Sequence, residues 1–353
     1  MSKRTVMVGT VPIGGGAPVS IQSMTSVEAH DEEGILQQIR RLQEAGCDIV
    51  RLAVPDQEAV EIFRKIKRKT SLPLVADIHF DYRLALMAIR VGADKIRINP
   101  GNIGTRDRLR KILKEAGQAG IPIRIGVNSG SLEKDLLARY GRVTAEALAE
   151  SALRNARMVE EEGFENIVLS LKSSDVRMNY EAYKLVAQAS PYPLHVGLTE
   201  AGTERRGRLK SAIGIGSLLL AGIGDTIRVS LTADPVEEVF AARQILETVG
   251  MRKPDYDLVS CPTCGRTAVD LCRLSDQIDR GLAERHYRKG LKVAVMGCAV
   301  NGPGEAAGAD YGVAAGKGKG LLFAGGKILA SVPENRLVEA FFAMLDQKER
   351  IED

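Results

Sequence analysis

The strongest constraint on the fold is an alternation of short apolar segments with amphipathic stretches, repeated eight times within the first 250 residues. The apolar segments are mostly continuous, which is typical of parallel strands buried on both faces. Eight strand–helix units in about 250 residues predict an α/β fold of the (β/α)8 TIM-barrel type. The predicted strands are residues 19–24, 49–54, 74–77, 95–98, 123–127, 166–171, 194–198 and 226–230.

Helical periodicity is clear in residues 32–45, where Ile35, Ile39 and Leu42 recur on one side and Arg40 lies on the other. Ahead of the first barrel strand, residues 5–18 are expected to form a short hairpin. The other helical stretches singled out are residues 57–69, 106–119, 144–162 and 235–248.

A change of composition near residue 251 predicts a second domain. Residues 251–255, Met-Arg-Lys-Pro-Asp, have the character of a linker. We therefore expect a substrate-binding barrel over residues 1–250 and a smaller α/β domain over residues 251–353. In the second domain, strands are expected at 257–260, 291–297 and 327–331, helices at 267–284 and 333–350, and a glycine-rich stretch at 309–319.

Overall composition excludes several classes of protein. The net charge is only +4, Trp is absent and aromatic residues make up 4% of the chain, so no nucleic-acid partner is expected. The longest apolar stretch, residues 213–223, is too short to span a membrane. No apolar signal region follows the basic first residues, so a cytoplasmic location is expected. Five cysteines then indicate thiols or a metal site rather than disulfides.

Three cysteines have the spacing of metal ligands. Cys261 and Cys264 are separated by a Pro-Thr turn, which lets both thiolates point toward one centre. Cys298 follows an apolar run and precedes a Gly-Pro-Gly turn, where free backbone amides can donate to sulfides or anions. The set therefore supplies three strong thiolate ligands.

The fourth ligand decides between metals. A structural zinc site would need Cys272 or His286 to complete a closed tetrahedron. An iron–sulfur cluster with three thiolates leaves one iron open, and Glu305 offers that iron an exchangeable oxygen. Spacing favours iron–sulfur over zinc, and both over a disulfide or bare thiols. Cys272 itself, between two leucines of a predicted helix, is expected to pack, as is Cys47.

Cations interrupt the carboxyl ends of five predicted strands, the end at which TIM barrels place their active sites. Each taken alone is most simply a partner of Asp48, Asp77, Asp94 or Glu165. Five cations at one barrel mouth would repel each other without an anionic ligand, and Arg geometry suits phosphate oxygens. The five are Arg51, Arg97, Arg124, Lys172 and Arg228, with Asn128 and Ser230 as neutral donors beside them.

Two further loops carry titratable groups at strand ends. Asp77 ends the third strand and His79 lies just after it, and Thr199 and Glu200 follow the seventh. We expect Thr199 to bind substrate and Glu200 to donate or orient a proton, because phosphate and added electrons would raise its proton affinity. The alternative for Glu200 is a salt bridge to a strand-end Arg. His79 and His195 are expected to be structural.

The motif Cys-Pro-Thr-Cys-Gly-Arg-Thr over residues 261–267, with Gly-Cys-Ala-Val-Asn-Gly-Pro-Gly-Glu over residues 297–305, closely resembles the bacterial 4-hydroxy-3-methylbut-2-en-1-yl diphosphate synthase family. The resemblance covers essentially the whole chain. It implies a [4Fe-4S] cluster as cofactor. The ligands it implies are Cys261, Cys264, Cys298 and Glu305.

The resemblance also implies a reaction. It is the reductive ring opening and dehydration of 2-C-methyl-D-erythritol 2,4-cyclodiphosphate to 4-hydroxy-3-methylbut-2-enyl diphosphate, in the non-mevalonate isoprenoid pathway. The five strand-end cations would hold the cyclic diphosphate. Flavodoxin or ferredoxin would supply electrons, and a homodimer would bring one subunit's cluster domain to the other's barrel.

Two rival functions remain at this point. One is a non-redox barrel transferase, similar to pterin synthases, with a structural zinc in its tail. The other is a zinc-ribbon nucleic-acid adaptor. The few aromatic residues, the modest charge and the lack of a fourth Cys or His close to the motif weigh against both. A dinucleotide site is not indicated, because residues 14–16, Gly-Gly-Gly, precede the first barrel strand instead of following it.

Overall fold

The computed structural model describes residues 2–298, 306, 308–316 and 318–349. The chain divides into two compact units, Met1–Arg252 and Lys253–Asp353. Among the described residues, no helix is both long enough and apolar enough to cross a bilayer.

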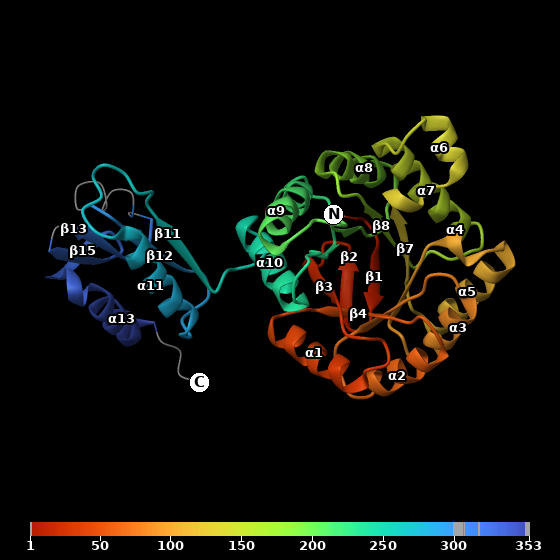
Figure 1. The fold of residues 1–353 in the computed structure, drawn as a ribbon, viewed down its shortest axis with the longest axis horizontal. Coiled ribbons are helices and arrows are strands. Elements are labelled where there is room, and N and C mark those ends of the chain that lie inside the picture. Colours follow the sequence, from red (N-terminus) through yellow and green to blue (C-terminus); the bar gives the residue numbers. More distant parts are fainter. Residues whose placement is uncertain (1, 299–305, 307, 317, 350–353) are drawn as a thin grey trace. The chain divides into compact units, whose positions relative to one another are not determined.

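The first unit is a parallel barrel surrounded by helices, which confirms the predicted TIM barrel (Figure 1). Its strands lie in the order β8-β7-β6-β5-β4-β3-β10-β9, and a parallel bridge between Leu169 and Leu194 joins the last strand region to the first. The barrel strands are β3 Ser20–Met24, β4 Ile49–Ala53, β5 Leu74–Asp77, β6 Lys95–Ile98, β7 Ile123–Asn128, β8 Ile167–Lys172, β9 His195–Val196 and β10 Thr226–Ile227.

The helices of this unit pack their apolar sides on the outward-facing strand residues. In α1, Asp31 caps the helix by accepting the Gly34 N–H at 2.9 Å, and Ile35, Ile39 and Leu42 are buried as predicted. The helices are α1 Glu32–Glu44, α2 Gln57–Lys67, α3 Tyr82–Arg90, α4 Pro100–Ile103, α5 Arg106–Ala119, the 3-10 turn η1 Ser129–Ser131, α6 Lys134–Tyr140, α7 Ala145–Glu160, α8 Val176–Ala189, α9 Glu204–Leu220 and α10 Pro235–Thr248.

A hairpin closes the amino end of the barrel. Strands β1 Thr5–Val8 and β2 Val11–Gly14 pair antiparallel, within the predicted hairpin. Its buried Val8 and Ile13 pack against Val75 and Val168, which point into the barrel near the start of their strands. This apolar plug leaves the carboxyl end as the open end of the barrel.

The second unit is a five-stranded sheet in the order β11-β12-β13-β14-β15. The first three strands are parallel and the last two antiparallel, and two helices share one apolar core with the sheet. The prediction missed two strands, because glycines at 312 and 316 disguise a buried strand as a loop. The elements are β11 Tyr256–Ser260, α11 Leu271–Ala283, β12 Leu291–Met296, β13 Tyr311–Gly316, β14 Lys319–Ala324, β15 Lys327–Pro333, η2 Glu334–Arg336 and α13 Leu337–Lys348.

Candidate functional site

All eight residues predicted to bind substrate line one cavity at the carboxyl end of the barrel. Its volume is about 300 Å³. The cavity is polar and cationic, and it is the kind of concave site expected at this end of the fold. It is lined by Met24, Arg51, Asp77, His79, Arg97, Arg124, Asn128, Ser170, Lys172, Thr199, Arg228 and Ser230.

Strand register explains why these side chains meet. Arg97 on β6 lies opposite Arg124 on β7, and Asn128 on β7 lies opposite Lys172 on β8. Paired residues of parallel strands point to the same face, which here is the barrel interior. A glycine makes room for one guanidinium, because a Cβ on Gly126 would lie 2.9 Å from Arg97 Nε.

Asp77 is the anion at the centre of this cationic site. Its carboxylate lies 3.8 Å from Arg51 Nε, 3.3 Å from Arg97 Nη1 and 3.4 Å from His79 Nε2. Burial alone would favour the protonated acid, but Arg51, the bond from His79 and the arginines Arg97 and Arg124 keep the pKa of Asp77 well below its usual range. Asp77 therefore stays ionised and holds two arginines in place.

A second carboxylate comes from a helix. Glu238 of α10 is 4% exposed and lies 3.5 Å from Arg228 Nη2. It accepts the Leu231 N–H at 2.9 Å and the Ser23 hydroxyl at 3.4 Å. The sequence analysis missed this residue, because nothing in an amphipathic helix marks the one glutamate that turns toward the barrel.

The five cations exceed these two carboxylates, which leaves a formal excess of three positive charges. Burial, and then neighbouring cations, lower the pKa of Arg51 to about 9 and lower the pKa values of Arg124 and Lys172 strongly. Arg124 is 1% exposed, and its Nε and Nη1 have no hydrogen-bond partner among the residues that the structure describes. Since guanidinium groups stay protonated in proteins, the described site contains buried donors that are available to an anion.

Glu200 lies at the rim of this site. Its neighbour Thr199 lines the cavity, whereas Glu200 itself is exposed and makes no ion pair with a described residue. The salt-bridge alternative is therefore not what the described structure contains. Glu200 has φ 53°, a left-handed conformation that is costly for residues with a side chain and that is often found at functional sites.

The predicted metal ligands lie on neighbouring loops of the second unit. Cys261 follows β11 and Cys298 follows β12, and these strands pair in parallel with Ser260 opposite Val295. The Gly297 N–H donates to Cys261 Sγ at 3.2 Å, so the two loops touch. Glu305 lies outside the described residues. Within the described part of the chain, no three Cys, His, Asp or Glu side chains form a metal-binding group.

Cys264 has the electrostatics of a ligand thiol. The backbone N–H of Arg266 and the Thr267 hydroxyl lower the pKa of its thiol, and its side chain is exposed. Cys272 is exposed too, so the prediction that its side chain packs in the interior of the domain was wrong. Its neighbours Leu271 and Leu274 take the inner face of α11 instead. Cys47 is buried as predicted, and burial raises the pKa of its thiol to about 12.

Comparison with known proteins assigns both units to one family. Residues 3–243 match the family described as GcpE TIM-barrel domain, and residues 257–347 match the GcpE protein C-terminal domain. Proteins from Caldanaerobacter subterraneus subsp. tengcongensis and Geobacillus kaustophilus, both called 4-hydroxy-3-methylbut-2-en-1-yl diphosphate synthase (flavodoxin), are 53% and 54% identical to this chain over 344 residues. The alignments cover 98% of this chain and 96% and 91% of those proteins.

The chain belongs to the 4-hydroxy-3-methylbut-2-en-1-yl diphosphate synthase family. Membership confirms the resemblance inferred from the cysteine motifs, and the protein is an enzyme of this family. Solved structures of dihydropteroate synthases from Stenotrophomonas maltophilia and Yersinia pestis resemble the barrel, each with a TM-score of 0.51, at 14% and 13% identity. They cover 69% and 70% of this chain and 96% and 98% of their own, and at this identity the likeness extends to the fold alone.

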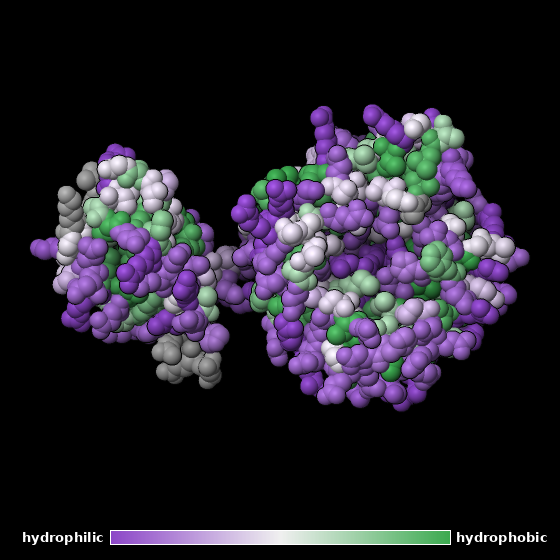
Figure 2. Space-filling view, in the orientation of Figure 1, coloured by the Kyte–Doolittle hydropathy of each residue, from purple (hydrophilic) through white to green (hydrophobic). Residues whose placement is uncertain are grey.

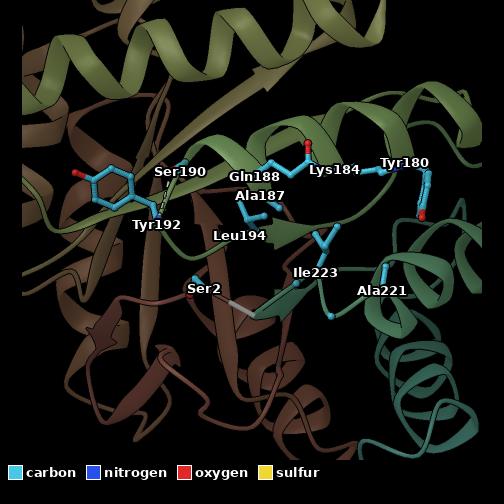
Figure 3. Close-up of a pocket in the computed structure, with 12 residues that line it drawn as sticks. Ser2, Tyr180, Lys184, Ala187, Gln188, Ser190, Tyr192, Leu194, Ala221 and Ile223 are labelled. Atoms are coloured by element: carbon cyan, nitrogen blue, oxygen red, sulfur yellow. Dashed lines mark hydrogen bonds between the residues drawn. The ribbon is translucent and has the colours of Figure 1, made fainter.

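A second cavity of about 340 Å³ lies at the amino end of the barrel in this family member (Figure 3). Tyr180, Lys184 and Gln188 of α8 line one side, and the segments preceding β9 and β10 line the other. No residue predicted for the functional site lies there. The candidate substrate site is therefore the cationic cavity and not this second one.

Proposed function

We propose that this chain carries out the reaction of its family at the cationic mouth of the barrel, converting 2-C-methyl-D-erythritol 2,4-cyclodiphosphate to 4-hydroxy-3-methylbut-2-enyl diphosphate. The observation that carries the proposal is the convergence of five cations on one cavity, where the described residues supply two carboxylates to balance them. A cyclic diphosphate carries one negative charge on each of its two phosphates and offsets two of these three surplus positive charges. Two electrons and two protons open the ring at a C–O bond to phosphate and release one hydroxyl as water.

The barrel residues bind and orient the diphosphate. Arg124 and Lys172, which are buried and have an excess of positive neighbours, supply charge-assisted hydrogen bonds to phosphate oxygens. Asp77 fixes the neighbouring arginines, so they need little reorganisation when substrate arrives. The full set of proposed substrate contacts is Arg51, Arg97, Arg124, Asn128, Lys172, Thr199, Arg228 and Ser230.

Glu200 is proposed to hold or deliver a proton at its carboxylate. Glu200 follows Thr199, which lines the cavity. Its carboxylate forms no ion pair with a described residue, so it is available to the substrate. The left-handed conformation of Glu200 is energetically costly, and such conformations are concentrated at functional sites, which supports a role for this residue.

The second unit is proposed to hold a [4Fe-4S] cluster through Cys261, Cys264, Cys298 and Glu305. Thiols on adjacent loops, a lowered thiol pKa at Cys264 and a backbone N–H directed at Cys261 Sγ suit such a cluster. When bound, the cluster supplies low-potential electrons one at a time.

Partners follow from the chemistry of the family. The names of both relatives include flavodoxin, which we propose as the electron donor, with ferredoxin as the alternative. We also propose a homodimer. Hydrophobic side chains gather near α9 on the outer side of the barrel (Figure 2), where Leu209, Ile213 and Leu220 are exposed. The free thiols favour a cytoplasmic location, where cysteines stay reduced.

Anaerobic purification tests the cofactor. The protein should be brown and contain iron and sulfide in a ratio of about one to one, as a cubane cluster requires. Cys264→Ser should lose iron and turnover, whereas Cys272→Ser, a matched change at another exposed cysteine, should keep both. A colourless zinc protein would contradict the proposal and favour the non-redox rival.

Turnover of the cyclic diphosphate by the reduced enzyme tests the reaction. Glu200→Gln should bind the substrate with nearly unchanged affinity but turn over more slowly, because the amide cannot donate a proton. Wild-type turnover in this variant would remove Glu200 from the mechanism.

A further inference from the structure

A second polar layer lies inside the barrel, one step below the cationic cavity. Lys95 precedes Arg97 by two residues on β6, so both side chains point into the barrel, with Lys95 nearer the amino end. On β9, His195 lies opposite Thr226 of β10, which in turn precedes Arg228 by two residues. Lys95 and His195 therefore lie between the cationic mouth and the apolar plug.

Both side chains are completely buried and lack hydrogen-bond partners within the described part of the chain. Lys95 and His195 are each 0% exposed. Lys95 Nζ and both ring nitrogens of His195 have no hydrogen-bond partner among the described residues. The same holds for the side chains of Gln22 and Thr226, which are polar but do not titrate. Buried polar groups are nearly always satisfied, so such a layer needs an explanation in function.

The charged groups around this pair are mostly cationic. Arg51 on β4 and Arg124 on β7 act on both Lys95 and His195, and Lys172 on β8 acts on His195. The carboxylates of the mouth are Asp77 on β5 and Glu238 on α10, and both already pair with arginines. Complete burial without a described hydrogen-bond partner, and then these cations, lower the pKa values of Lys95 and His195 and favour the neutral form of each side chain.

We propose that Lys95 and His195 take up a proton when the diphosphate binds, so that substrate binding and protonation of this inner pair are coupled. The inference rests on the proposed function of the mouth. Negative phosphates next to Arg51 and Arg124 offset the positive field that disfavours protonation of the pair. Each phosphorus of a cyclic diphosphate carries one strongly acidic oxygen, so the ligand does not titrate near neutral pH and the proton enters the protein from solvent.

Coupling makes the inner pair a store of positive charge. Without ligand, Lys95 and His195 are neutral in this scheme, so the barrel avoids the desolvation cost of two further buried cations. With ligand, one proton adds to the attraction for the phosphates and lies within the barrel in which the reaction consumes protons. Both residues are positioning residues in this scheme, because neither lines the substrate cavity.

Calorimetry tests the coupling directly. The cyclic diphosphate is titrated at pH 7.5 into oxidised, anaerobic holoenzyme in two buffers with different enthalpies of ionisation. The dependence of the binding heat on buffer gives the number of protons taken up. Linkage predicts about one proton per ligand and an affinity that weakens by up to about tenfold for each unit of rising pH.

Variants locate the proton. Lys95→Met/His195→Gln should bind with little proton uptake and an affinity nearly independent of pH. Gln22→Met, a matched loss of an unpartnered polar group without titration, should keep the wild-type uptake. Uptake that persists in the double variant would assign the proton to another group, such as Lys172, and overturn the inference.

The two proposals fail in distinguishable ways. Absence of binding by the wild-type enzyme would contradict the proposed function of the mouth. Normal binding without proton uptake would leave that function intact and overturn the coupling. The wild-type measurement alone is decisive, should the double variant fold poorly.

Discussion

The two ends of the barrel handle charge in opposite ways. At the amino end, acidic residues just before strands accept a backbone N–H from the neighbouring strand. Asp48 accepts from Ile21 at 2.7 Å, and Asp225 accepts from Leu194 at 2.8 Å. Asp94 likewise accepts the Leu74 N–H at 2.7 Å. At the carboxyl end, cations predominate and donors of Arg124 have no partner in the described structure.

The cations of the amino end are neutralised locally. Lys67 pairs with Asp94 at 2.5 Å, and Arg4 pairs with Glu165 at 2.8 Å on the surface. Three of the four acidic residues considered as partners of the strand-end cations thus belong to the opposite end. The comparison suggests a rule for reading charged residues in this barrel. A charged side chain that pairs with another residue of the chain stabilises the fold, whereas a buried cation without such a partner is available to bind an anionic ligand.

Asp77→Asn should have the largest effect on stability, because it removes the charge that compensates two buried arginines. Breaking a buried ion pair costs about 3 to 5 kcal/mol, so the Tm of the barrel should fall by about 10 °C in calorimetry. Asp48→Asn at the other end keeps an oxygen for the Ile21 N–H and should cost far less. Equal losses would contradict the contrast between the ends.

Lys95→Met should stabilise the unliganded barrel in a pH-dependent way. The folded state lowers the pKa of Lys95, so the unfolded chain binds the proton more tightly and wild-type stability rises with pH toward the unfolded pKa. The advantage of the variant should shrink by up to about 1.4 kcal/mol per pH unit between pH 7.5 and 9. A constant difference in Tm across this range would show that Lys95 carries a proton in the folded protein.

Val8→Ala tests the apolar plug. Val8 is completely buried among residues of the amino end, so loss of two methyl groups should cost about 2 kcal/mol and lower the Tm of the barrel by about 4 to 8 °C. Diphosphate affinity should not change. A large loss of affinity would mean that the plug shapes the site.

Arg4→Ala should have the smallest effect. The Arg4–Glu165 pair is exposed to solvent on both sides, and solvent screening leaves such pairs with little effect on stability. The Tm should stay within about 2 °C of the wild-type value. A larger fall in Tm would show that cations at the amino end also contribute substantially to the stability of the barrel.

The barrel could be predicted from the sequence because its strands are continuous apolar runs. The predicted and observed strands differ only in where they begin and end. The seventh and eighth strands are shorter than predicted and span His195–Val196 and Thr226–Ile227. The cations of the mouth were predictable, because the barrel rule places strand-end residues together. Glu238 was not, because only tertiary packing turns it inward.

The polar residues of the second layer have no distinct signal in the sequence. Lys95 begins a predicted strand, and His195 is predicted to be structural. Their shared lack of partners appears only when β6 and β9 are placed in the barrel. In the second unit, the cysteine spacing predicted neighbouring loops, whereas the exposure of Cys272 depends on which helix face packs.

The central claim is that the surplus cations of the carboxyl end bind a diphosphate. Its most direct test is calorimetric titration of the cyclic diphosphate into anaerobic wild-type enzyme, Arg124→Met and Arg4→Met. Losing one partner of a buried charge pair costs about 3 kcal/mol, so Arg124→Met should bind about 100-fold more weakly, and Arg4→Met should match the wild type. Equal affinities for all three proteins would contradict the claim.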